Sequence, residues 1–382
     1  MKRPSILLLS STLLVGVLAV VLAIMPSLAA FASGGGSSFI GQFKHISTVA
    51  STVPANGDVN PYGIVVAPTT TGNLTRGNVL ISNFNAVSNL QGTGTTVMQI
   101  TPGGSVSVFA QLTAGKLHGA CPGGVGLTTA LVALRRGWVV VGSLPTADGT
   151  SATAKAGCLI VLDNNGNPVE TFSGSPINGP WDMTASDQGG NASLFVTNVL
   201  NGTVAGGGQV VNRQTVVRLD LEVPWPGQGK PEVEATTVIG SGFSARTDPA
   251  ALVIGPTGVG LHNGTLYVND SLNNRIAAIP QAITRTTSAL TGKDVTSNGS
   301  LNDPLGLTIA PNGDILTVNG NDGRIVETTP GGTQVAHKFI DKTITPPSTV
   351  PGAGCLFGLT IVPGGAGVYF VDDCTNTLNI LN

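Results

Sequence analysis

The residues best suited to chemistry in this chain are oxygen-bearing side chains that end short apolar segments. Asparagine or aspartate ends five of six such segments, and Gly142 ends the remaining one. With the aspartates that directly follow two of them, the set is Asn83, Asn198, Asn269, Asp270, Asn319, Asp372 and Asp373. Amide and carboxylate oxygens suit a hard cation such as Ca²⁺, so one prediction is an oxygen ring that binds a divalent cation. The alternative is that these side chains bond local backbone groups and shape turns.

A second set of side chains stands where other apolar segments begin. Its polar members are Asn60, Asp182, Asp248 and Asp303, and aspartate before proline, as in 248–249 and 303–304, is typical of a turn. Its aromatic members are Tyr62, Trp181 and Phe357. Together with Asp182, the aromatic residues predict the floor of a pocket; packing between neighbouring sheets is the alternative interpretation.

Several common catalytic arrangements are missing from the sequence. His45, His118, His262 and His337 fall in different parts of the repeating pattern, so they are not expected to meet on zinc. The chain has no Gly-x-Ser-x-Gly elbow, no Walker-type loop and no Cys-x-x-Cys pair. The residues therefore indicate a binding face without specifying a reaction.

An internal repeat positions these side chains. A turn, a small residue and an aliphatic residue recur, followed by two to three further short apolar segments. The repeat begins at 61–64, 124–127, 180–183, 249–252, 304–307 and 356–359. Six units of short strands joined by Gly-, Pro- and Asn-containing turns predict an all-β, six-bladed β-propeller.

The last unit is incomplete, which indicates how the ring closes. After Asp372 only ten residues remain, enough for one strand at 377–381 but not for two. The segment 43–50 precedes the first unit and belongs to none of the six. We therefore predict that it supplies the outer strand of the last blade, which would also remove an exposed sheet edge.

Two stretches resemble a known repeat. Residues 264–276 and 303–325 are similar to NHL repeats, and the whole pattern resembles the NHL and gluconolactonase-like group of six-bladed propellers. The gluconolactonase-like resemblance implies one divalent metal held at the channel mouth by carboxylate and asparagine side chains. No glutamate stands before a first strand in this chain, and such folds host lactonases, lyases and binding modules alike.

The four cysteines can be paired from the repeat. Cys121 and Cys355 each lie just before the first strand of a blade, and Cys158 and Cys374 lie after the second strand of the same two blades. Bridged cysteines need Cα atoms within about 7 Å, and blades two and six are not neighbours in a six-membered ring. We therefore predict the disulfides Cys121–Cys158 and Cys355–Cys374.

The N-terminus predicts export. Lys2 and Arg3 precede an apolar run at 6–24, and 30–32 fits an A-x-A cleavage site before Ser33. The alternative is an uncleaved membrane anchor, because the run is nearly long enough to span a bilayer. The expected organisation is a signal peptide or anchor at 1–32, a flexible linker at 33–41 and one propeller at 42–382, in a secreted, periplasmic or cell-surface protein.

Composition limits the partners. Charged residues make up 10% of the chain and the formal net charge is -2, which argues against nucleic acid because phosphate neutralisation needs a basic face. A membrane is expected as a partner only through an uncleaved N-terminal segment. Two functions stay open: a non-catalytic module that binds a small molecule or protein on the channel-mouth face, with or without a cation such as Ca²⁺, and a metal-dependent hydrolase or lyase.

Overall fold

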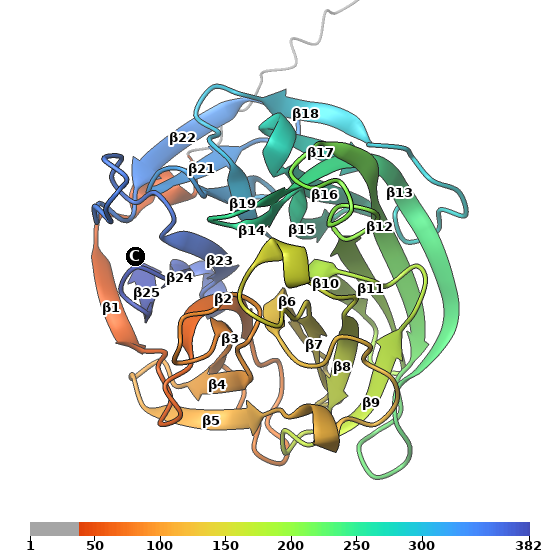
Figure 1. The fold of residues 1–382 in the computed structure, drawn as a ribbon. Coiled ribbons are helices and arrows are strands. Elements are labelled where there is room, and N and C mark those ends of the chain that lie inside the picture. Colours follow the sequence, from red (N-terminus) through yellow and green to blue (C-terminus); the bar gives the residue numbers. More distant parts are fainter. Residues whose placement is uncertain (1–37) are drawn as a thin grey trace, which may run out of the picture. The chain divides into compact units, whose positions relative to one another are not determined.

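Short apolar segments separated by tight turns form twenty-five strands in the part of the chain that the structure describes. The computed structural model describes residues 38–382, so the predicted signal peptide at 1–32 lies outside the described residues. The strands make six sheets arranged as blades around a central axis (Figure 1). The predicted six-bladed propeller is therefore confirmed.

In blades one to five the strands follow one another in chain order from the inner strand outwards. Blades one and two contain β2 (Val59–Val66), β3 (Val79–Asn85), β4 (Thr96–Ile100) and β5 (Val106–Gln111), then β6 (Leu127–Ala133), β7 (Val139–Ser143), β8 (Cys158–Leu162) and β9 (Pro168–Ser173). Blade three contains β10 (Pro180–Asp187), β11 (Asn191–Asn198), β12 (Val211–Glu222), β13 (Glu232–Asp248) and the short β14 (Leu252–Ile254). Blades four and five contain β15 (Pro256–His262), β16 (Thr265–Asp270), β17 (Arg275–Ile279) and β18 (Lys293–Ser297), then β19 (Pro304–Ile309), β20 (Ile315–Asn319), β21 (Arg324–Thr328) and β22 (Gln334–Phe339).

The sixth blade is built from both ends of the propeller. It contains β23 (Leu356–Ile361), β24 (Val368–Asp372), β25 (Thr377–Leu381) and, on the outside, β1 (Ile46–Ser51). β1 pairs antiparallel with β25, from Ile46 opposite Leu381 to Ser51 opposite Thr377. The predicted closure is confirmed, although the strand occupies 46–51 rather than 43–50.

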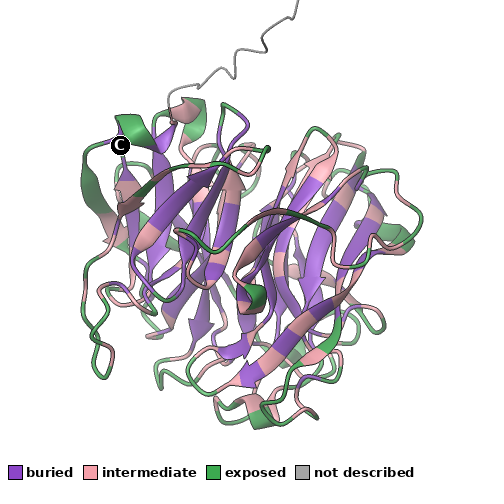
Figure 2. Cartoon of the chain, turned by 90° about the horizontal axis from the view of Figure 1, so that it is seen from above, coloured by how far each residue is buried: buried purple, intermediate pink, exposed green. Residues whose placement is uncertain are grey.

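The core lies between the blades. The second strands β3, β7, β20 and β24 are buried along their whole length, whereas outer strands such as β5 are largely exposed (Figure 2). These strands are rich in Val, Ile, Leu and aromatic residues, as expected for strands covered on both faces. Apolar clusters join neighbouring blades; one includes Trp138 of blade two and Leu219 of blade three.

Glycines let the inner strands meet around the axis. In blades four to six the third residue of the inner strand is a glycine: Gly258, Gly306 and Gly358. A Cβ at each would collide with a backbone carbonyl of the next blade, those of Leu305, Phe357 and Tyr62 respectively. The glycine of this pattern is therefore a packing requirement, and the carbonyl of the residue before the Gly of one blade lies against the Gly of the blade before it.

Blade four begins later than the repeat predicted. Residues 249–252 do not form its inner strand: Leu252 lies in β14, which pairs with the end of β13. The inner strand is β15, which starts at Pro256. Asp248 instead starts a turn, because its Oδ1 accepts the backbone N–H groups of Ala250 at 2.9 Å and Ala251 at 3.1 Å. The segment 249–252 resembles the start of the other repeats in composition but lacks the glycine that the inner strands of blades four to six share.

The residues before β1 are attached to blade five. The short 3₁₀ helix η1 (Ile40–Gln42) follows Phe39, and both Phe39 and Ile40 are buried. Glu327, a buried residue of β21, accepts the backbone N–H groups of Phe39 at 2.7 Å and Ile40 at 2.8 Å. The linker predicted at 33–41 therefore extends too far toward the C-terminus. Its last residues belong to the propeller, because they bury apolar side chains and donate hydrogen bonds to a buried carboxylate.

Four further 3₁₀ turns lie in the loops: η2 (Ala114–Lys116), η3 (Ser151–Thr153), η4 (Ser271–Asn273) and η5 (Pro363–Gly365). Within residues 38–382, no helix has the length and apolar character needed to cross a bilayer.

Deleting residues 38–51 should lower the melting temperature of the propeller strongly, because it removes β1 and opens the ring at β25. Circular dichroism during a thermal scan measures this. A shortened protein that melts at the temperature of the full propeller would contradict the closure.

Glu327→Gln should also destabilise the protein, by about 1–3 kcal/mol, because the amide nitrogen that replaces one carboxylate oxygen would face a buried backbone N–H instead of accepting from it. Urea unfolding at neutral pH measures the loss. Glu222→Gln, a change of the same type at an exposed strand end, is the control and should leave stability unchanged.

Candidate site at the channel mouth

A cavity of about 920 Å³ opens on the face where loops lead into the inner strands. Its lining comes from loop or strand-end residues at 59–62, 85–91, 246–254, 303–305, 320–321, 345–357 and 373–376. These segments belong to several blades, so only the closed ring brings them together. The volume lies in the range of ordinary small-molecule sites.

Aromatic side chains form the floor of this cavity. The structure brings the predicted residues Tyr62, Trp181 and Phe357 together there. The rings of Tyr62 and Phe357 are stacked with centroids 3.8 Å apart, and Trp181 meets Tyr62 edge to face at 6.2 Å. Phe84 stacks on the other side of Tyr62 at 4.5 Å. These side chains line the cavity and also pack together in one apolar cluster.

A smaller cavity of about 260 Å³ lies in the central channel, on the other side of these rings. The same three aromatic residues line both cavities, so they separate the mouth from the channel. Asp182 lines the channel rather than the mouth, and its Oδ2 accepts the N–H of Val259 at 3.1 Å. Burial raises the pKa of Asp182 to about 7 despite backbone donors that lower it. Asp182 therefore lies apart from the mouth cavity for which the sequence suggested it.

Three carboxylates and one guanidinium line the mouth. Asp248 pairs with Arg246 at 2.7 Å. Asp303 and Asp373 have no such partner among residues 38–382. Burial, reinforced by the negative charge of Asp372, raises the pKa of Asp373 to about 7. Burial and the charge of Asp248 raise the pKa of Asp303 to about 6, although Arg246 opposes this.

Several lining residues also have an enclosed oxygen to which no group of the described chain donates. These are Oδ1 of Asn60, Oδ1 of Asn85, Oε1 of Gln91 and Oδ1 of Asp303. The exposed fraction is 5% for Asn60 and 2% for Asn85. Buried polar oxygens are normally hydrogen-bonded, so their concentration around one cavity indicates a site that accepts donors from outside the chain.

The predicted oxygen ring does not assemble around the axis. Among its members only Asp373 lines the mouth cavity; Asn83, Asn198, Asn269, Asp270, Asn319 and Asp372 do not. Each of these six is buried within the blades.

The asparagines of this set bind loop backbone instead. Oδ1 of Asn198 accepts the N–H of Asn178 at 3.2 Å, and Oδ1 of Asn319 accepts that of Asn302 at 3.1 Å. Nδ2 of Asn83 donates to the carbonyl of Thr52 at 3.1 Å. Each bond ties the loop before an inner strand to the end of the second strand.

The remaining members of the set have other partners. Asn269 donates to the Leu305 carbonyl of the next blade at 2.9 Å. Asp270 forms a buried ion pair with Arg275 at 2.9 Å. The turn-forming alternative therefore describes this set better than cation binding, and these side chains position the mouth loops.

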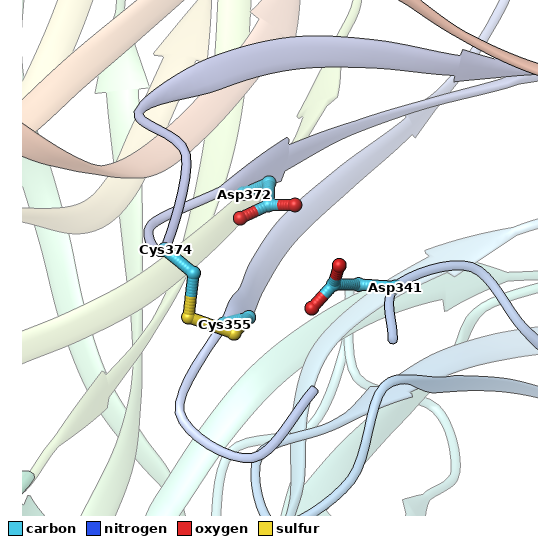
Figure 3. Close-up of side chains that lie close together, drawn as sticks. All are labelled: Asp341, Cys355, Asp372 and Cys374. Carbon is cyan, nitrogen blue, oxygen red and sulfur yellow. A yellow bond between two sulfur atoms is a disulfide. The ribbon is translucent and has the colours of Figure 1, made fainter. Parts of the chain in front are cut away.

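Asp372 belongs to a separate acidic group beside a disulfide. The carboxylates of Asp341 and Asp372 face each other next to the Cys355–Cys374 bridge (Figure 3). Burial and the charge of Asp341 raise the pKa of Asp372 to about 6. Ligand atoms of all four residues lie within 4.8 Å of one another. Because both sulfurs are bonded to each other, only the two carboxylates remain as ligands for a hard cation.

Both predicted disulfides are present. The Cα atoms are 5.2 Å apart in Cys121–Cys158 and 4.9 Å apart in Cys355–Cys374. The second bridge joins Cys355, at the end of the 345–354 segment, to Cys374 in the 373–376 turn, and both segments line the cavity.

Sequence reasoning missed part of the mouth. Arg246, Asn85 and Gln91 carry no repeated pattern, so nothing local marks them. Asn60 and Asp303 were recognised only as polar residues before inner strands. A signal was available: both precede a proline and have left-handed backbone, with φ of 63° and 58°. Asn and Asp tolerate that conformation best among residues with a side chain.

Comparisons with known structures support the fold. A gluconolactonase from Xanthomonas campestris aligns with a TM-score of 0.54 and 13% identity over 88% of each chain. A luciferin-regenerating enzyme gives 0.52 and 11%, covering 88% of this chain and 95% of its own. A putative gluconolactonase gives 0.50 and 16%, covering 88% and 91%. No family model and no curated protein sequence matches the chain. This chain has the fold of the gluconolactonase-like six-bladed propellers.

Asp373→Asn should stabilise the protein at pH values above its pKa. An acid whose pKa is raised to about 7 keeps a proton that the unfolded chain loses near pH 4, so the free energy of unfolding falls as pH rises between those values. The amide removes that cost, and we expect a gain of about 1–2 kcal/mol at pH 8 but little change near pH 4. Urea unfolding at both pH values measures it.

Asp270→Asn is the matched control, because it makes the same aspartate-to-asparagine change at a site where the carboxylate is paired with Arg275. It should destabilise the protein at pH 8. Loss of stability in both variants would contradict the view that Asp373 is unpaired.

Proposed function

We propose that this protein is an extracytoplasmic binding module that holds a small molecule in the mouth cavity. The observation that carries the proposal is the combination of an aromatic floor with two unpaired carboxylates, Asp303 and Asp373, in one cavity of about 920 Å³. Isolated buried carboxylates are costly, and such residues in a cleft are candidates for function.

Export is supported by two features. The disulfides Cys121–Cys158 and Cys355–Cys374 are typical of an oxidising compartment. The sequence at 1–32 has the pattern of a signal peptide, which agrees with that compartment. We therefore place the binding face outside the cytoplasm.

The arrangement of the carboxylates favours binding of an organic molecule over metal-dependent catalysis. In the described chain, the acidic, histidine and cysteine side chains close enough to share one ion are Asp341, Cys355, Asp372 and Cys374. None of Asp248, Asp303 and Asp373 belongs to that group. Asp303 and Asp373 therefore have no third acidic, histidine or cysteine ligand close enough to share one ion with them in the described chain.

The alternative function is hydrolysis or lyase chemistry at the same mouth. One observation favours it: the pKa values of Asp303, about 6, and Asp373, about 7, lie near neutrality, where a carboxyl group works best as a general acid or base. A metal-dependent form would need ligands besides these carboxylates.

Metal content and lactone hydrolysis separate the two functions. We expect the purified protein to hydrolyse gluconolactone no faster than buffer, with or without added Ca²⁺ or Zn²⁺. Elemental analysis after dialysis should find less than one equivalent of divalent metal. Stoichiometric metal together with turnover that a chelator abolishes, and that Asp373→Asn also abolishes, would overturn the binding function in favour of the enzyme.

A further inference from the structure

We propose that the ligand of the mouth cavity is an organic cation, with its ammonium group against the unpaired acceptors of the mouth and its apolar part against the aromatic floor. This inference rests on the proposed binding function and specifies the chemistry of its ligand. It follows from the charges, the unpaired acceptors, the floor and the size of the cavity.

The charge at the mouth is negative. The ionisable groups that line the cavity are Asp248 and Arg246 from the end of β13, Asp303 before β19, Asp373 after β24 and the hydroxyl of Tyr62 in β2. Arg246 is held by Asp248 at 2.7 Å, so it is not free to receive an anion. Asp303 and Asp373 remain without a cationic partner in the described chain, and Asp372 adds a further negative charge beside Asp373. An anionic ligand would meet repulsion from both.

The hydrogen-bonding groups are complementary to a donor. The enclosed oxygens that line this cavity without a partner belong to Asn60, Asn85, Gln91 and Asp303, and all of them are acceptors. Asn60 and Asn85 are more than nine-tenths buried and line the cavity from blade one. An ammonium group brings several N–H donors and no acceptor, which matches this set.

The floor suits the rest of such a molecule. Phe357 is partly exposed and stacks on Tyr62 with centroids 3.8 Å apart, and Trp181 stands edge-on to Tyr62. Faces of aromatic rings attract cations and also pack against flat apolar groups. A hard metal ion such as Ca²⁺ takes oxygen ligands rather than ring faces, and a cavity of about 920 Å³ is far larger than an ion needs.

Three compounds of matched shape test the charge. We expect 2-phenylethylammonium to bind, 2-phenylethanol to bind at least about tenfold more weakly, and phenylacetate to bind most weakly of the three. Isothermal titration calorimetry measures the affinities. Tryptophan fluorescence in a Trp138→Phe, Trp225→Phe background reports whether Trp181 senses the ligand.

Variants of the lining residues test whether the ligand binds in the mouth cavity. Asp303→Asn and Asp373→Asn should each weaken ammonium binding about tenfold and leave the affinity for 2-phenylethanol unchanged. Phe357→Ala should weaken both compounds. Asp294→Asn is the control, because Asp294 is exposed on β18 and does not line the cavity. Circular dichroism confirms that each variant is folded before titration.

The pH dependence gives a second measurement. Affinity for the ammonium compound should rise from about pH 5 to about pH 8 as Asp303 and Asp373 lose their protons, and the alcohol should show no such rise. The rise should flatten in the Asp303→Asn, Asp373→Asn double variant.

The outcomes separate this inference from the function on which it rests. If the alcohol or phenylacetate binds as tightly as the ammonium compound and Phe357→Ala weakens it, the mouth binds ligands but the ligand is not a cation. If ammonium binding is unaffected by Phe357→Ala and by both aspartate changes, the mouth is not the binding site and both proposals fall. Absence of measurable ammonium binding would overturn the cation inference.

Discussion

The pairing of β1 with β25 is the interaction on which the mouth depends. It joins residues more than 300 positions apart in sequence, and without it blade six would end in an open edge. It also orients the loop that follows β1. The backbone N–H of Asn60 donates to Oδ1 of Asn376 at 2.7 Å, and that of Thr52 donates to the Asn376 carbonyl at 2.9 Å. Asn60 and the 373–376 turn therefore reach the cavity as one unit, set by closure.

Close packing of the inner strands explains why the aromatic residues of the floor lie together. The carbonyl of the residue before an inner-strand glycine lies against the glycine of the preceding blade, as for Phe357 on Gly306 and Tyr62 on Gly358. The side chains of the residues at this position are thereby held next to one another at the top of the channel. Blade three departs from the pattern, since Asp182 replaces the glycine and bonds Val259 of blade four through its carboxylate. That exchange places a buried acid in the channel below the floor.

The mouth also shows a conflict between stability and function. Asp270 and Glu327 are buried carboxylates with donors supplied by the chain, whereas Asp303 and Asp373 are half-buried and have no cationic partner among residues 38–382. A protein selected only for stability would replace the second pair, because an uncompensated acid in a low-dielectric site raises the free energy of the folded state. Local violations of this kind are expected where a ligand supplies the missing partner.

The sequence by itself determined the six blades, the strand that closes them and the two disulfides, because each follows from a repeat with a fixed order and from the number of residues left over. It also identified the aromatic residues of the floor, which share one position in that repeat. The tertiary structure decided which oxygens face the cavity. The asparagines at the ends of the second strands have a repeated position, yet their side chains form hydrogen bonds with nearby loop backbone groups and do not face the cavity. Arg246, Asn85 and Gln91, by contrast, reach the mouth from loops with no common pattern. It also decided where blade four begins, because 249–252 and 256–259 look alike in sequence and only Gly258 leaves room for the Leu305 carbonyl of the neighbouring blade.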